Sequence, residues 1–464
     1  MINSMYYVKD FGAKADGITL DTVAIQTAID TCNKNGGGKV VLEGGTFLSG
    51  TIYLKSNVDF NITISAKLLG SDDPNMYSKD THHNRYIDEP DMDRCFIYAQ
   101  DVTNIAITGK GEICGNGASL PIKGGIARPM MIRILRCKYI RLNGLRLRDS
   151  AAWTTAFLDS ENIWAEDLDI SSQTNYNGDG LDFDGCKNIF VSNCRIDGSD
   201  DNICLQASSR EYPVKNVHIV NCSLSSVCAG IRIGLKSVGD ISNVVIQNCT
   251  FENVWREGIK IESSEGGKIE NIMANNLVMH NVRRPLYLLC NNTIAGLGIT
   301  EFPAIGELKG VTISNLRITE DNEMKNTHLR FGKDIMGTPQ FNGIRIDAHK
   351  THKIESVILS NINYQVLGGI KADEIPEEYP EVLDCRIEKD KRGSGNYYPD
   401  WSRTGFMDIR NVDDIQIENI RLSSIACDER TPVIIENCNE ITQNNIIIKN
   451  HGNDKIMSMG SMEN

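Results

Sequence analysis

Five aspartates lie close together in the middle of the chain, and their spacing could bring carboxyl groups together for acid and base chemistry. They form three groups: Asp179, then Asp182 with Asp184, then the adjacent pair Asp200 and Asp201. A glycosidic bond is cleaved when one carboxylic acid protonates the leaving oxygen while another carboxylate activates water or attacks carbon. In a shared groove at least one pKa would rise, because ionising a second nearby carboxyl group costs Coulomb energy.

Aspartate beside glycine also marks turns, so each group has a structural alternative. We interpret Asp182 and Asp184 as turn or supporting residues. Asp179, Asp200 and Asp201 are the predicted catalytic residues, because the adjacent acids repel each other and a turn gains nothing from the second charge. A Ca²⁺ site is another use of such a cluster, but the ligand spacing of an EF-hand is missing from the sequence. We predict no metal and no cofactor.

A repeated unit places these acids within a larger pattern. The unit alternates apolar residues and then has Asn followed by Cys, Leu or Ile, with early spacings of 28, 27 and 28 residues. The repeated asparagines are Asn193, Asn221, Asn248, Asn276, Asn315, Asn361, Asn419 and Asn445. A fixed period of this length is typical of a solenoid.

The solenoid is predicted to be a parallel β-helix, because each unit holds short runs with strand-like alternation and no recurring helical pattern. Coils of such a fold stack about 4.8 Å apart, so equivalent residues lie above one another. The asparagines are expected to form an internal amide ladder at a turn of the coil. Asp200 and Asp201 follow Asp179 by 21 and 22 residues, about one coil, which should bring the three carboxyl groups onto one patch of groove.

The whole chain, residues 1–464, is predicted to be a single all-β domain with an N-terminal cap over about residues 1–38. The cap contains a helix, because apolar residues recur at helical spacing before a stop at residues 35–38. Two departures from the repeat, about residues 77–93 and 368–405, are predicted to be inserted loops. Long insertions in a compact repeat are often functional, although a solvated charged loop is the alternative.

The composition limits the partners and the compartment. A net charge of −13 argues against nucleic acid or an anionic membrane as partner. The first residues have neither a basic nor an apolar signal region, and no run approaches the roughly 20 apolar residues of a membrane span. We expect a cytoplasmic protein that binds carbohydrate, with its 14 cysteines reduced and mostly in the core. The pattern does not specify the oligomeric state.

Several motifs together resemble one family. Asn177-Gly-Asp-Gly-Leu-Asp and Gly198-Ser-Asp-Asp are similar to the Asn-x-Asp-Gly and Gly-x-Asp-Asp motifs of the polygalacturonases, glycoside hydrolase family 28. Tyr7-Val-Lys-Asp-Phe-Gly-Ala, Arg128-Pro-Met-Met-Ile and Ala152-Trp-Thr resemble other segments of that family in the same order. The combined order is a strong signal, whereas any one motif alone would be weak.

The resemblance implies a right-handed parallel β-helix of the pectin-lyase-like type and hydrolysis with inversion. It assigns Asp200 as the general acid and Asp179 with Asp201 as the pair that activates water. An inverting enzyme keeps acid and base about 6.5–9.5 Å apart to leave room for that water.

The chain departs from the family pattern at two sites. Where the family has Gly-His-Gly, Ala229 replaces the histidine, and where it has Arg-x-Lys, the sequence has Lys260 and Glu262. The family lysine would pair with a galacturonate carboxylate, and an acid in its place would repel one. This difference predicts a neutral or non-galacturonate sugar.

Further substrate-binding candidates come from the same coils and from the loops. Arg232 and Lys260 could hold sugar hydroxyls, although both could also be ordinary outward-facing strand residues. Side chains that could line the groove are His82, His83, Tyr398 and Trp401.

Three functional classes remain open from the sequence. The first is a glycoside hydrolase that acts on oligosaccharides or chain ends, because long loops tend to close one end of a groove. The second is another carbohydrate reaction on the same solenoid: a lyase, an intramolecular transferase or an epimerase. The third is a glycan-binding β-helix without catalysis. Retention of three aspartates argues against the third class, and the altered Arg-x-Lys and missing histidine keep the second open.

Overall fold

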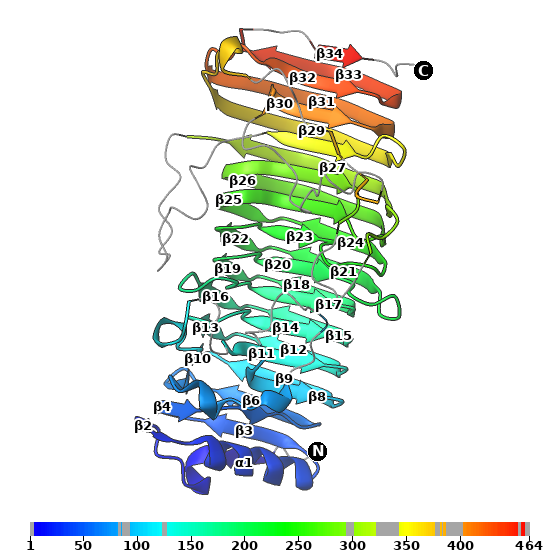
Figure 1. Cartoon of the computed structure of the whole chain (residues 1–464). Helices are drawn as coiled ribbons and strands as arrows, with labels where there is room; N and C mark the ends of the chain where they lie inside the picture. The colour runs from blue at the N-terminus through cyan, green and yellow to red at the C-terminus, as the bar shows by residue number, and fades with distance from the viewer. Residues whose placement is uncertain are drawn as a thin grey trace. The chain divides into compact units, whose positions relative to one another are not determined.

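The protein is built almost entirely from parallel β-strands that stack as successive coils (Figure 1). The computed structural model describes residues 4–81, 85, 93–122, 128–293, 301–321, 343–375, 381–382, 384–386, 402–452 and 456–459. The described residues divide into two compact units. The first holds the residues up to Cys204 with Lys215–Cys222, and the second holds Leu205–Val214 and the residues from Ser223 onward.

In the first unit the strands form three rows, and most strands pair with the strand three places later in the chain. The first row is β1 (Met5–Tyr7), β3 (Gly38–Leu42), β6 (Val58–Ile62), β9 (Thr103–Gly109), β12 (Lys138–Asn143), β15 (Glu161–Glu166), β18 (Lys187–Ser192) and β21 (Val214–Val220). The second row is β2 (Asp16–Leu20), β4 (Gly45–Ser49), β7 (Ala66–Gly70), β10 (Glu112–Cys114), β13 (Arg146–Arg148), β16 (Asp169–Ser172) and β19 (Arg195–Gly198). The third row is β5 (Ile52–Tyr53), β8 (Cys95–Gln100), β11 (Met130–Leu135), β14 (Thr155–Leu158), β17 (Leu181–Asp184) and β20 (Ile203–Gln206).

In the second unit several strands run from one face of the coil to the next without a break. Its strands are β22 (Ser223–Ser226), β23 (Ile231–Ile233), β24 (Ile241–Gln247), β25 (Thr250–Ser263), β26 (Lys268–Cys290), β27 (Glu307–Thr319), β28 (Ile344–Ala348), β29 (Ile354–Gly368), β30 (Thr404–Arg410), β31 (Val412–Ala426), β32 (Thr431–Glu436), β33 (Asn439–Lys449) and β34 (Ile456–Met459). The longest, β26, pairs with β24, β25, β27 and β28.

Stacked aliphatic side chains fill the interior of each coil. Ile140 pairs in register with Ile163, which pairs with Ile189, which pairs with Val217, and all four are buried. Full burial of such a side chain stabilises the fold by about 1.5–3 kcal/mol. The alternation of apolar and polar residues therefore specifies the register of every coil, because a shift by one residue would turn the apolar set outward.

The predicted N-terminal helix is confirmed. Helix α1 (Thr22–Lys34) buries Ala24, Ile25, Ala28, Ile29 and Cys32 and packs against β3, β5 and β6. The predicted fold class, an all-β parallel β-helix with a short capping helix, agrees with this architecture. The single-domain boundary of residues 1–464 stays a prediction, and much of the two predicted loops, about residues 77–93 and 368–405, lies outside the described residues.

The asparagine ladder exists, but its predicted internal position is wrong. Asn361 donates a hydrogen bond from Nδ2 to Oδ1 of Asn315 at 3.1 Å, and Asn419 donates to Asn361 at 3.1 Å. These asparagines are exposed and adopt left-handed backbone angles, with φ of 55° at Asn361. Asparagine tolerates that conformation better than other residues with a side chain. The ladder therefore stabilises surface turns, while the Cys, Leu or Ile that follows is buried, except for the half-buried Ile446.

The cysteines are thiols, and all except Cys427 are buried. Burial raises the pKa of Cys95 to about 12, so this thiol is unreactive at neutral pH. Among the described helices, none is long and apolar enough to cross a bilayer.

Candidate active site

The first unit brings the segments that carry Asp179, Asp200 and Asp201 together on adjacent coils. Asp179 lies between β16 and β17, and the other two lie between β19 and β20. The backbone N–H of Gly180 donates to the carbonyl oxygen of Asp201 at 3.0 Å, and the N–H of Gly178 donates to Ser199 Oγ at 2.9 Å. One coil therefore separates the predicted base and acid along the chain, as their spacing indicated.

Glycines make this close approach possible. A Cβ atom on Gly178 would lie 2.1 Å from the carbonyl oxygen of Ser172, and one on Gly180 would lie 2.3 Å from that of Asn202. No side chain fits at either position without a backbone shift. The two glycines of the Asn-Gly-Asp-Gly sequence therefore allow the backbone around Asp179 to lie close to the neighbouring segments.

The three carboxyl groups differ in exposure. Asp179 and Asp201 are buried, at 5% and 3% exposed, whereas Asp200 is half-buried. A carboxylate oxygen of Asp200 lies within 4.8 Å of one of Asp201. Asp200 Oδ2 accepts a hydrogen bond from Asn177 Nδ2 at 3.2 Å, and Asp200 Oδ1 accepts one from the N–H of Asp201 at 3.0 Å. Asp200, the most accessible of the three acids, therefore accepts hydrogen bonds from two donors.

Asn177 and Arg128 support Asp200, and the sequence reasoning assigned neither of them a role. Arg128 is buried and donates from Nη2 to Asn177 Oδ1 at 3.0 Å and from Nη1 to the carbonyl oxygen of Tyr176 at 2.7 Å. Because its oxygen accepts from Arg128, the amide of Asn177 must turn its NH₂ group toward Asp200. Arg128 and Asn177 each belong to a family-like motif of the sequence. The sequence does not show that the two side chains meet.

Asp182 and Asp184 are strand residues of β17, so their interpretation as turn residues is wrong. Both are buried, and they pair in register with Ala156 and Leu158. Arg85 Nη2 lies 3.4 Å from Asp184 Oδ2 and 2.7 Å from Asp159 Oδ1. Burial raises the pKa of Asp159, although the Arg85 guanidinium opposes that shift. The supporting role allowed for Asp184 agrees with this ion pair.

The second unit brings Arg232, Lys260 and Glu262 together. Arg232 on β23 is the register neighbour of Lys260 on β25. Glu262 Oε1 lies 3.0 Å from Lys260 Nζ and 2.8 Å from Arg232 Nη2, and it accepts a hydrogen bond from Arg232 Nε at 2.9 Å. Lys260 and Glu262 are fully buried and Arg232 is 6% exposed. These three side chains form one ionic cluster, the Glu262 cluster.

Two cations share the Oε1 atom of Glu262, so its negative charge is compensated within the cluster. The predicted neutral or non-galacturonate sugar is therefore not supported. Burial lowers the pKa of Lys260, and the neighbouring Glu262 carboxylate opposes that shift. The expected repulsion of a substrate carboxylate is therefore offset within the cluster.

Glu265 lies two residues beyond β25 and is fully buried. Its Oε2 accepts a hydrogen bond from the N–H of Ser237 at 3.2 Å, and its Oε1 has no hydrogen-bond partner among the described residues. Burial raises the pKa of Glu265 to about 8, with the Glu262 charge adding to the shift. Glu265 is therefore mostly protonated at neutral pH and adds little negative charge near the cluster.

The other predicted binding residues are not placed. His82, His83, Tyr398 and Trp401 lie outside the described residues. Ala229, at the position of the family histidine, is fully buried.

Comparisons with known proteins identify the family of the chain. Residues 32–361 match the family described as glycosyl hydrolases family 28. A probable polygalacturonase of Vitis vinifera is 26% identical over 313 residues, 61% of this chain and 62% of that protein. An exo-poly-alpha-D-galacturonosidase of Dickeya chrysanthemi is 26% identical over 451 residues, 82% of this chain and 74% of that protein.

Solved structures support the same fold. A hyperthermoactive exopolygalacturonase from Thermotoga maritima superimposes with a TM-score of 0.64 at 22% identity and covers 79% of this chain and 88% of its own. The predicted right-handed parallel β-helix and the predicted polygalacturonase-like glycosidase class are thus confirmed. The chain belongs to glycosyl hydrolases family 28.

Proposed function

We propose that the chain hydrolyses an O-glycosidic bond of a galacturonate-containing plant oligo- or polysaccharide with inversion at the anomeric carbon. Asp200 is the general acid, and Asp179 and Asp201 position and deprotonate the attacking water. The observation that carries this proposal is the pair of contacts, Gly180 to Asp201 and Gly178 to Ser199, that ties the two acidic segments together on adjacent coils.

The environment of Asp200 suits proton donation to a leaving oxygen. It is the most exposed of the three acids, so a substrate oxygen can approach it. After the proton leaves, the amide of Asn177 and the N–H of Asp201 remain directed at its two carboxylate oxygens. Hydrogen bonds to the charged form stabilise it, so both donors favour the transfer.

The Glu262 cluster supports an acidic substrate. Arg232 and Lys260 compensate the charge of Glu262, which lessens its repulsion of a sugar carboxylate, and Arg232 is the member that retains some exposure. The similarity to proteins named as galacturonases points to the same substrate class.

A neutral sugar is the second candidate, because Lys260 is fully buried and bonds to Glu262 rather than facing solvent. An exo mode of attack and a cytoplasmic location stay predictions from the sequence.

The test is a comparison of polygalacturonate with neutral galactan and arabinan as substrates. The anomer of the first product is followed by NMR and the product mass by mass spectrometry. We expect reducing ends from polygalacturonate, with inversion and addition of water. Cleavage confined to the neutral polymers would favour the second candidate, and an unsaturated, cyclised or epimerised product would favour a lyase, a transferase or an epimerase.

Two variants test the assigned roles. Asp200→Asn should lower kcat by about 10²–10⁴-fold, the usual contribution of a general acid. Asp167→Asn is the matched control, because Asp167 is an exposed turn residue of the same unit with φ of 54°. Asn177→Ala should shift the alkaline limb of the pH profile of kcat to higher pH, because it removes a donor that stabilises the charged form of Asp200. Full turnover by Asp200→Asn would refute the assignment.

A further inference from the structure

A basic turn in the second unit separates two polar hollows. The turn joins β28 to β29 and consists of His349, Lys350, Thr351, His352 and Lys353. Lys350 and Thr351 line both hollows, whose volumes are about 370 Å³ and 560 Å³. Both values fall within the range of about 300–1,000 Å³ of small-molecule sites. Together the two hollows could hold a ligand longer than one ring.

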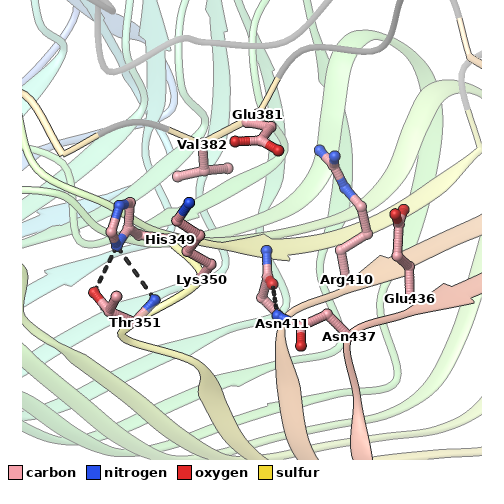
Figure 2. A pocket seen from close by; sticks show the side chains of 9 residues that line it. All are labelled: His349, Lys350, Thr351, Glu381, Val382, Arg410, Asn411, Glu436 and Asn437. Atoms are coloured by element: carbon pink, nitrogen blue, oxygen red, sulfur yellow. Dashed lines mark hydrogen bonds between the residues drawn. The ribbon is translucent and has the colours of Figure 1, made fainter. Parts of the chain in front are cut away.

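Figure 2 shows the side chains around the smaller hollow. His349 and Lys350 stand on one side and Arg410 and Glu436 on the other, with Glu381 above and between them. Asn411 and Asn437 lie at its base. Hydrogen-bond donors and acceptors therefore surround the space on several sides.

The turn has a defined conformation. The N–H of His352 donates to the carbonyl oxygen of His349 at 2.9 Å, and the N–H of Thr351 lies 3.3 Å from His349 Nδ1. Nδ1 of His349 also lies 2.8 Å from Thr351 Oγ1, so both polar groups of Thr351 lie against the ring.

Most charges around the hollows already have partners. Arg410 bonds to Asp347, which also accepts from Arg345 at 2.9 Å. On the same walls, Glu436 Oε2 accepts from Arg403 at 2.8 Å and Lys353 Nζ lies 3.2 Å from Asp413. Lys350 differs from these cations, because it is exposed and has no ion pair with any described residue. Lys350, a cation without an ion pair among the described residues, thus lines both hollows.

The charged and polar side chains around the two hollows favour one class of ligand. Glu381 and Glu436 would repel a densely charged polyphosphate or nucleic acid more strongly than a sugar chain with one carboxylate per ring. A neutral sugar could use the amides and carboxylates but would leave Lys350 unmatched. A chain of uronic acid residues supplies both carboxylates for the lysine and hydroxyl groups for Asn411, Asn437 and Glu381.

We propose that the two hollows form a second carbohydrate site that binds an acidic oligosaccharide, with Lys350 contacting a uronate carboxylate. The site lies away from the Glu262 cluster on the same strand row. Glu262 on β25 pairs in register with Leu289 on β26, and Leu289 pairs with Asp347 on β28. Strand β28 pairs in turn with β30, which carries Arg410, so three steps of about 4.8 Å give about 14 Å in all. The choice of uronate as ligand rests on the proposed function, since an enzyme that cleaves acidic chains would meet them here.

The test is isothermal titration of the full chain with trigalacturonate, in an Asp200→Asn background that prevents cleavage. We expect two classes of binding site. Lys350→Gln in that background should weaken one class about tenfold or more, because it removes a charge-assisted contact. Lys449→Gln is the matched control, since Lys449 is another exposed lysine of the same unit, at the end of β33. Galactotriose, the neutral probe, should bind without any dependence on Lys350.

Two further results separate the inference from the proposed function. Lys350→Gln with Asp200 intact should keep the wild-type rate on a short substrate that fills only the catalytic groove. One class of site in the titration, or identical binding by Lys350→Gln and Lys449→Gln, would overturn the second site even if polygalacturonate is cleaved. Failure to cleave polygalacturonate, with two trigalacturonate sites intact, would overturn the proposed function and leave the second site standing.

Discussion

Replacing Glu262 by Gln removes the one acid shared by two buried cations. In the wild-type protein the Oε1 atom of Glu262 lies 2.8 Å from Arg232 Nη2 and 3.0 Å from Lys260 Nζ, and all three side chains are almost completely inaccessible. Glutamine has nearly the same shape and can still accept one hydrogen bond. The substitution therefore removes charge while keeping the packing.

The expected cost is large because the cations cannot move into water. Breaking a buried ion pair by removing one partner typically costs about 3–5 kcal/mol in the free energy of unfolding. A partly exposed pair is worth about 0–1 kcal/mol. Glu270→Gln is the matched control, because Glu270 pairs with Lys268 at 2.8 Å on β26 and its side chain is 28% exposed. The two variants should differ by about 2 kcal/mol or more.

The deficit of Glu262→Gln should shrink as pH rises. The folded-state pKa of Lys260 is already lowered by burial, and loss of Glu262 removes the main influence that raises it. A lysine with a lowered folded-state pKa binds fewer protons when folded than when unfolded, so stability rises with pH between that pKa and the unfolded value of about 10.4. This window widens in the variant, because its Lys260 loses the proton at lower pH.

The measurement is urea unfolding of the wild type, Glu262→Gln and Glu270→Gln at pH 7 and pH 9. A loss no larger in Glu262→Gln than in Glu270→Gln at pH 7 would refute the description of a buried shared charge. A deficit that grows between pH 7 and pH 9 would refute the linkage to Lys260.

Two more predictions concern the same unit. Glu320 accepts hydrogen bonds from Tyr364 Oη at 2.8 Å and from the N–H of Leu367 at 3.1 Å, and burial raises its pKa from 4.5 to about 7. The folded state binds the extra proton between these values, so stability should fall by about 3 kcal/mol from pH 4.5 to above pH 7, and Glu320→Gln should abolish that fall in urea titrations. Asn361→Ala should cost about 1–2 kcal/mol, because it removes two amide contacts and leaves alanine at φ of 55°, whereas Asn361→Gly should cost less. Equal losses for alanine and glycine would show that the backbone angle contributes nothing.

The coils, the capping helix and the adjacency of the acids were predictable, because each depends on a period along the chain. Ile25, Ala28, Ile29 and Cys32 are buried at helical spacing, as their positions required. The exposure of the asparagine ladder was not predictable in the same way. An amide can form a ladder inside a coil or on its surface, and only the left-handed backbone angle distinguishes the two.

The side-chain partners at the site were not predictable from spacing. Arg128 and Asn177 are 49 residues apart, and nothing local indicates that their side chains meet. Asp182 and Asp184 show the opposite error, because the nearby glycines suggested a turn while both residues belong to a buried strand.

At Glu262, the residue type alone is a poor guide to the local charge. The sequence places an acid where the family has a base, and repulsion of a carboxylate follows if that acid faces the substrate alone. The structure pairs Glu262 with two cations, so its negative charge does not stand alone at this position. Burial of Lys260 also means that less cationic surface is left for a substrate there. Lys350, exposed and without an ion pair among the described residues, offers an acidic chain a second cation in this unit, apart from the Glu262 cluster.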